Sequence, residues 1–141
     1  MSSRRKGRIL AFQTLFSKDF NNNSIEELIK FNWMDESKLE NFDNETLNFA
    51  KLLVTGTIEN LEVIDLSIKK QLKSWDFNRI VKVELAILRL SVYSLLYQKD
   101  IPSTVTINEA VDIAKDYGSD DAFRFINGIL DGIKKSKKNE N

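Results

Sequence analysis

Four cationic side chains lie within five residues near the N-terminus, namely Arg4, Arg5, Lys6 and Arg8. They lead without a Pro into apolar residues with helical spacing, so the charge is placed at one end of a rigid element. Closely spaced cations can contact several phosphates at once, and each contact to single-stranded RNA adds about 0.7 to the salt dependence of binding. A generic basic tail is the alternative. The residues alone leave RNA, DNA and a membrane surface open as partners.

The rest of the chain offers little reaction chemistry. Its 141 residues contain no His and no Cys, which excludes His- or Cys-based nucleophile pairs and the usual ligands of zinc. The five Gly residues are scattered and form no phosphate-binding loop. Asp120 and Asp121 can bind Mg²⁺ in principle, but at a helix start such carboxylates ordinarily complement the helix dipole. We therefore expect no enzymatic activity, no catalytic residue, no metal site and no cofactor.

Composition and charge indicate a folded protein with separated charges. The chain is 42% hydrophobic and 30% charged, and it lacks an apolar run long enough for a signal peptide or a membrane span, which predicts a cytoplasmic location. Between Asp19 and Asp65 eleven acidic residues face three lysines, whereas cations gather at both ends. We expect residues 1–7 to form a basic arm. Residues 134–141 have four lysines and nothing apolar, which predicts a flexible tail.

Apolar residues recur with helical spacing along most of the chain, and no segment shows the alternation of a strand. The predicted helices cover residues 8–20, 24–33, 43–72, 79–97, 106–117 and 119–133. Gly56, in the middle of 43–72, is interpreted as a boundary between two helices, with a kink or a close helix–helix approach as the alternatives. Thr106 and Glu109 form a capping-box pattern, and Gly118 is placed to end the preceding helix. Residues 79–97 are apolar on nearly every face, which predicts a central helix. The fold class is therefore all-α.

Four segments, in order and over nearly the whole chain, resemble the bacterial transcription antitermination factors of the NusB family. They are residues 4–16 (RRKGRILAFQTLF), 87–93 (ILRLSVY), 100–115 (DIPSTVTINEAVDIAK) and 125–131 (FINGILD). The resemblance implies one domain over residues 1–141, built of about seven helices in two packed helical subdomains. It also implies that the protein acts with NusE, a small-subunit ribosomal protein. Together they would bind the boxA element of nascent RNA and help to assemble an antitermination complex on RNA polymerase, notably during ribosomal RNA transcription.

The resemblance also implies which residues contact RNA. By matching position they are Arg4, Arg5, Lys6, Arg8, Phe16, Asp121 and Phe125. The family commonly has Tyr where this chain has Phe16, so stacking is kept and a phenolic hydrogen bond is lost. Lys6 replaces a frequent Arg, which keeps the charge without the bidentate fork. We interpret Asn127 and Gly128 as packing residues that let two helices approach closely.

Glu84 matches a position that the resemblance places at the NusE interface, with Lys82 and Arg89 as neighbours. A carboxylate there would suit a basic ribosomal protein. An intramolecular ion pair is the alternative for Glu84. Ser94 stands where the family has Glu, so any contact of that Glu is lost.

Two other functions stay open at this point. One is a helical protein–protein adaptor with an incidental basic arm. The other is the N-terminal RNA-binding domain of an RNA cytosine methyltransferase, which needs a catalytic domain with a nucleophilic Cys that these residues lack. The free protein is expected to be a monomer or a homodimer.

Overall fold

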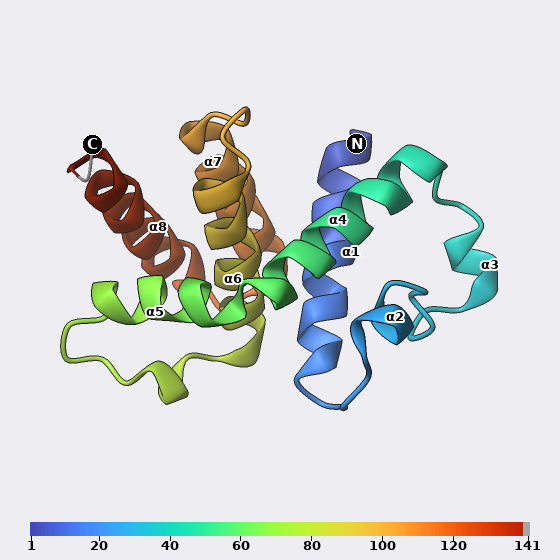
Figure 1. The fold of residues 1–141 in the computed structure, drawn as a ribbon, viewed down its shortest axis with the longest axis horizontal. Coiled ribbons are helices and arrows are strands. Elements are labelled where there is room, and N and C mark those ends of the chain that lie inside the picture. Colours follow the sequence, from blue (N-terminus) through green and yellow to red (C-terminus); the bar gives the residue numbers. More distant parts are fainter. Residues whose placement is uncertain (140–141) are drawn as a thin grey trace. The chain divides into compact units, whose positions relative to one another are not determined.

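The computed structural model describes residues 1–139, and within them it contains eight α-helices and one 3₁₀ helix but no strand (Figure 1). The predicted all-α class is confirmed, with eight α-helices in place of about seven. The helices are α1 (Ser3–Lys18), α2 (Ile25–Leu28), α3 (Glu36–Leu39), α4 (Asn44–Glu59), α5 (Leu61–Gln71), η1 (Phe77–Arg79), α6 (Lys82–Tyr97), α7 (Ser103–Tyr117) and α8 (Ala122–Asn139).

The chain divides into two compact units, of which unit 1 is Met1–Glu59 and unit 2 starts at Asn60. In unit 1, α1 packs along α4, and α2 also contacts α4. In unit 2, α6 contacts α5, α7 and α8, and α8 contacts α5 and α7. Eleven of the sixteen residues of α6 are buried, so the prediction of a central helix holds for unit 2.

Helix α1 begins at Ser3 rather than at Arg8, so the cationic cluster belongs to its first two turns. The Ser2 hydroxyl caps the helix by accepting a hydrogen bond of 3.1 Å from the Arg5 amide. Gly7 is buried against α4, where an added Cβ would lie 2.9 Å from Cδ2 of Phe49. This close approach holds the first turns in place. A cap and a packing contact, rather than apolar periodicity, therefore fix the start of the helix.

Helix α4 begins as predicted but does not end as predicted. The Asp43 carboxylate accepts a hydrogen bond of 2.8 Å from the Thr46 amide, so Asp43 caps this helix. The predicted division of residues 43–72 into two helices is confirmed, but the boundary lies at Asn60 rather than at Gly56, because α4 runs on to Glu59 and α5 starts at Leu61. Val54 and Thr57 are buried on either side of Gly56, and this packing outweighs the low helix propensity of Gly.

The cap at Asp43 gives a testable prediction. The hydrogen bonds from Thr46, chiefly that of its amide, hold the pKa of Asp43 below its ordinary value of 3.8. The cap therefore contributes stability above that value and loses it as the pH falls through the lowered pKa. We expect Asp43→Ala to lower Tm by a few degrees at neutral pH, and Asp43→Asn to keep most of the cap without its acid dependence. Thermal unfolding followed by circular dichroism across the acid range measures both. Equal melting of all three proteins at neutral pH would contradict the cap.

The segment between α1 and α4 differs from its prediction. Helix α2 ends at Leu28 instead of continuing to Trp33. Phe31 is 1% exposed and has a φ of 55°, so the chain leaves the helix in order to bury this ring. Residues 35–41, which none of the predicted helices covers, contain α3.

Two starts in unit 2 also differ from their predictions. Helix α7 begins at Ser103, directly after Pro102, whose carbonyl accepts from the amides of Val105 and Thr106. Thr106 is thus a buried residue inside the helix, and the predicted capping box is wrong. Gly118 ends the helix as predicted. Helix α8 starts at Ala122 rather than at Ser119.

The predicted tail over residues 134–141 overlaps α8, which runs to Asn139. Residues 140–141 lie outside the described residues.

Candidate nucleic-acid interface

The cationic side chains of α1 differ in how far they are available. Arg4 and Lys6 are exposed, Arg5 is half-buried, and Arg8 is only 9% exposed. Arg4 and Arg8 both lie over the ring of Phe49 on α4, with guanidinium carbons 4.5 and 5.4 Å from its centroid. Phe49 therefore orients two of the four cations. Arg8 serves the packing of α1 on α4, while the others present charge to solvent.

The placement of this charge conflicts with the stability of the helix. Helices α2 to α6 each have an acidic residue in the first turn, whereas α1, α7 and α8 have none, and the first turn of α1 has three cations instead. Cations near a helix N-terminus are unfavourable, because the helix dipole places positive partial charge at that end. The same dipole and the same cations attract an anion together. Such a conflict between local stability and charge is typical of a functional site.

Two aromatic rings lie at the other end of α1. Phe16 is eleven residues after Arg5, so the two side chains share one helical face about 16 Å apart. Phe16 is half-buried, and its ring meets that of Phe20 edge to face at 5.0 Å. Phe20 is 67% exposed and was not among the predicted site residues. Its spacing of four residues from Phe16 was the available signal.

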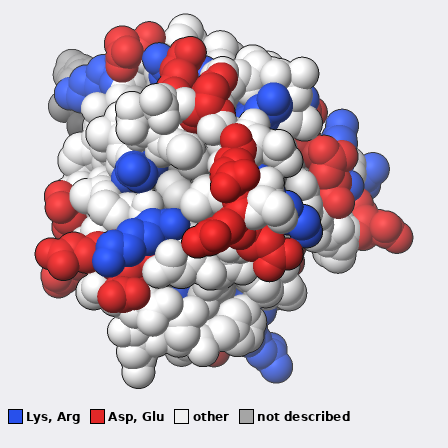
Figure 2. Space-filling view, turned by 90° about the vertical axis from the view of Figure 1, so that its right-hand side faces the viewer, with Lys and Arg blue, Asp and Glu red and all other residues white. Residues whose placement is uncertain are grey.

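Acidic side chains also mark the surface of unit 1. Figure 2 views the protein from the side on which α2 and α3 lie in Figure 1, and it shows several groups of Asp and Glu on that face. Such groups repel phosphates. The N-terminal turns of α1 are therefore the better candidate for an anion site.

Asp121 and Phe125 belong to unit 2, at the start of α8. The carbonyl of Asp121 accepts from the amides of Arg124 and Phe125, at 3.1 and 3.5 Å, and its side chain is exposed. The ring of Phe125 lies 6.4 Å from that of Trp75, at an angle of 49°. Trp75 is 59% exposed, so its ring is not packed beneath the turn that carries it.

A pocket of about 310 Å³ brings Asp121 and Phe125 together with Glu84. We call it the acidic pocket; its other lining residues include Trp75, Arg79, Ile80 and Val81. The residue expected to meet a partner protein and two residues expected to meet RNA thus share one pocket of unit 2. Sequence spacing did not indicate this arrangement.

The carboxylate of Glu84 lacks a counter-ion. Glu84 is 8% exposed and forms no hydrogen bond or ion pair with any residue that the structure describes, so the alternative of an intramolecular pair is not met there. Burial away from water raises its pKa above the ordinary 4.5. Lys82, two residues earlier on α6, is exposed. The carboxylate oxygens of Glu84 are not fully enclosed, so a cation from outside can reach them.

Arg89 has a partner within the fold. Its Nε and Nη2 donate to the two carboxylate oxygens of Asp65 at 2.9 Å each, in the bidentate arrangement that is strongest for this pair. Asp65 lies on α5, so the pair ties α5 to α6. Asp65 was not predicted as the partner of Arg89, because residue spacing in the sequence does not show which helix faces Arg89.

The residues that the structure describes form neither a metal site nor a membrane-spanning helix. Within residues 1–139, no three acidic side chains converge in a way that could hold a metal ion. Over the same residues, no helix combines the length and the apolar character that crossing a bilayer requires.

Comparison with known proteins gives consistent results. A sequence profile of the NusB family matches residues 5–135. The transcription antitermination protein NusB of Treponema pallidum (strain Nichols) is 51% identical over 133 residues, which cover 94% of this chain and 93% of the relative. That of Treponema denticola is 47% identical over 131 residues, covering 93% and 95%.

Solved structures agree. NusB of T. maritima superposes with a TM-score of 0.83 at 38% identity, covering 98% of this chain and 97% of that one. A chain from a crystal structure of the antitermination factors NusB and NusE in complex with dsRNA gives 0.84 at 29% identity, covering 96% and 98%. The protein belongs to the NusB family.

Proposed function

We propose that the protein is an RNA-binding antitermination factor that acts together with NusE. The pair would bind boxA-type single-stranded nascent RNA and help to assemble an antitermination complex on RNA polymerase, notably on ribosomal RNA operons. The observation that carries the proposal is the cationic cluster in the first turns of α1, in a family whose named members are antitermination proteins. The role places the protein in the cytoplasm, and residues 1–141 would act as one RNA-binding domain.

The proposed RNA contacts combine charge with stacking. Arg4, Arg5 and Lys6 would contact phosphates, which the N-terminal dipole of α1 also attracts. Arg8 would support them from its position over the ring of Phe49. Phe16 supplies a ring for an unstacked base on the same face as Arg5. On unit 2, Phe125 would stack likewise.

Asp121 is proposed as an RNA contact of a different kind. A carboxylate beside RNA repels phosphates, but it accepts hydrogen bonds from base amino groups and from the 2′-hydroxyl. The exposure of the Asp121 side chain supports this use.

The proposed NusE contact is centred on Glu84. Its buried carboxylate would gain a counter-ion from a basic ribosomal protein, and removal of the remaining water would strengthen that pair. Lys82 lies at the exposed start of the same helix and would contact the rim of the partner. Arg89 would act less directly, because its pair with Asp65 holds α5 against α6 beneath this surface.

Size-exclusion chromatography of the purified protein mixed with purified NusE tests the proposal. We expect the mixture to elute as one complex, earlier than either protein alone, with a further shift when boxA-containing RNA is added. The protein run alone gives its free oligomeric state. Separate elution of the two proteins at micromolar concentrations would contradict the proposed partnership.

A further inference from the structure

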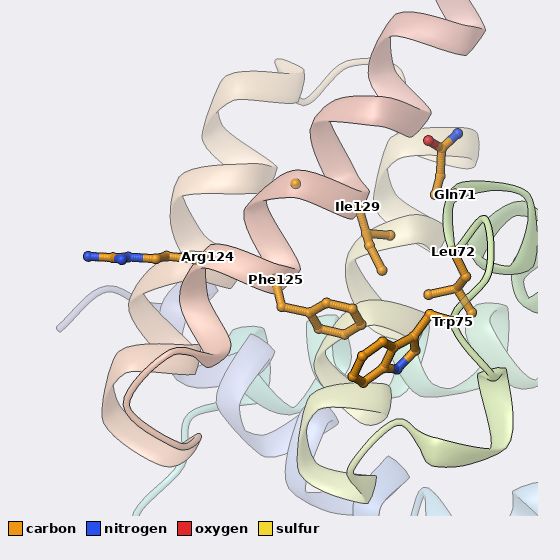
Figure 3. A pocket seen from close by; sticks show the side chains of 7 residues that line it. Gln71, Leu72, Trp75, Arg124, Phe125 and Ile129 are labelled. Carbon is orange, nitrogen blue, oxygen red and sulfur yellow. The ribbon is translucent and has the colours of Figure 1, made fainter.

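The rings of Trp75 and Phe125 also border a second pocket of about 310 Å³ on unit 2, which we call the aromatic hollow (Figure 3). In Figure 3 the two rings point toward one another, Trp75 from the segment after α5 and Phe125 from α8. The remaining lining residues include Gln71, Leu72, Gly128 and Ile129. The aromatic pair thus has the acidic pocket and the aromatic hollow as neighbours.

The indole of Trp75 is largely exposed, although it lies beside the ring of Phe125. The chain turns at Lys73, whose φ is 54°, and the Trp75 amide then donates to the Leu72 carbonyl at 2.8 Å. This turn leaves the indole 59% exposed, although a Trp side chain stabilises a protein mainly through the apolar area that it buries. An exposed indole beside a pocket is a ready contact for a ligand.

Gly128 supplies an independent observation. It lies inside α8, where Gly is less favourable than Ala, yet an added Cβ would meet nothing within 4 Å. The interpretation of Gly128 as a close-packing residue is therefore wrong. Gly132, one turn later, differs, because a Cβ there would overlap the side chain of Gln71. Gly128 leaves open space over the aromatic hollow that no part of the described chain fills.

We propose that the aromatic hollow receives one unpaired base of the bound RNA. The proposal rests on the proposed function and names a contact within it. A flat base can stack on the exposed indole while the bare backbone at Gly128 lets it approach α8. The side-chain amide of Gln71 can bond to the edge of the base.

The charges favour a nucleotide over a basic protein in this hollow. No carboxylate lines it, and its one charged lining residue is Arg124. The Arg124 side chain is exposed and extends away from the rings (Figure 3), with its guanidinium carbon 5.4 Å from the centroid of the Phe123 ring. Glu84, the proposed contact for the basic protein, lines the acidic pocket instead, together with Asp121 and Arg79.

The fluorescence of Trp75 can show directly whether its indole contacts an RNA base. The chain has two Trp residues, so Trp33→Phe leaves Trp75 as the sole indole. A boxA-containing RNA with a terminal dye is added while Trp75 emission and dye anisotropy are both recorded. We expect the emission to be quenched by base stacking and to saturate at the same RNA concentration as the anisotropy. A saturating anisotropy signal with unchanged Trp75 emission would overturn the proposal.

A second variant fills the hollow. Gly128→Met places a side chain at the hollow from a Cβ that meets no atom within 4 Å, and Asn127→Met, at an exposed position outside the lining, is its matched control. We expect Gly128→Met to weaken RNA binding between about fivefold and a hundredfold, the effect of removing one stacked base. Asn127→Met should bind as the unaltered protein does, and neither variant should melt at a lower temperature.

The remaining outcomes distinguish a failure of the base site in the aromatic hollow from a failure of the proposed function. If the unaltered protein binds RNA and Gly128→Met binds it equally well, the hollow is not a base site although the proposed function stands. If Gly128→Met weakens binding of NusE but not of RNA, the hollow belongs to the protein partner and the proposal is wrong. If the unaltered protein binds no RNA, with or without NusE, the proposed function and this contact both fail.

Discussion

Replacing Arg4, Arg5 and Lys6 together with Ala is expected to weaken binding to boxA-containing RNA by about a hundredfold at ~0.1 M salt. The logarithmic slope of affinity against salt should fall by about two, because each lost phosphate contact on single-stranded RNA removes about 0.7. Arg8 is left in place, since it is buried over Phe49 and its loss would disturb the packing of α1 on α4.

A charge-matched control separates local from general electrostatics. Lys30, Lys38 and Lys51 are exposed residues of the same unit, and replacing all three with Ala removes the same charge. We expect that variant to keep most of the affinity and of the salt slope. Fluorescence anisotropy at several salt concentrations measures both triple variants. Equal losses in the two would mean that α1 contributes only net charge and is no specific contact.

Glu84→Gln is expected to weaken the complex with NusE at least tenfold, because it removes the charge that would pair with a cation of the partner. The substitution keeps the size and shape of the side chain, so the acidic pocket should be preserved. The control is Glu62→Gln, at an exposed position on α5 in the same unit. Isothermal titration calorimetry with NusE measures each protein. Unchanged affinity for Glu84→Gln would remove Glu84 from the proposed interface.

The same substitution should stabilise the free protein. Because burial raises the pKa of Glu84, the folded chain binds a proton at this site more readily than the unfolded chain does. Stability from this group is therefore fully present below the ordinary pKa of 4.5 and declines as the pH rises through the raised pKa. Glu84→Gln removes that decline, so its Tm should exceed that of the unaltered protein at neutral pH and match it in acid. A higher Tm together with weaker NusE binding would show that stability is given up at this site for recognition.

Apolar periodicity predicted the main helices and the central position of α6 within unit 2, because burial dominates the stability of long helices. It failed where a single local contact decides the outcome. Ser2 and Pro102 start α1 and α7 earlier than the apolar pattern does. Phe31 ends α2 early because the core of unit 1 needs its ring. The contacts of Ser2 and Pro102 are local but polar, and the burial of Phe31 depends on residues elsewhere in unit 1, so a pattern of apolar spacing contains neither kind of information.

The candidate site was predicted in part for the same reason. The cationic cluster is visible in the sequence, but only the structure shows that Phe49 lies beneath Arg4 and Arg8. Phe20 and Trp75 were missed because sequence alone does not distinguish an exposed ring from a buried one. The open space at Gly128 is likewise a property of its surroundings.

The central claim, that the protein recognises boxA-type RNA together with NusE, is tested most directly by one titration. A dye-labelled boxA-containing RNA and a scrambled RNA of the same composition are each titrated with the protein, with and without purified NusE, and followed by fluorescence anisotropy. We predict weak, salt-sensitive binding of both RNAs by the protein alone, and tighter binding of the boxA sequence alone when NusE is present. Equal affinity for the two RNAs that NusE leaves unchanged would contradict the claim.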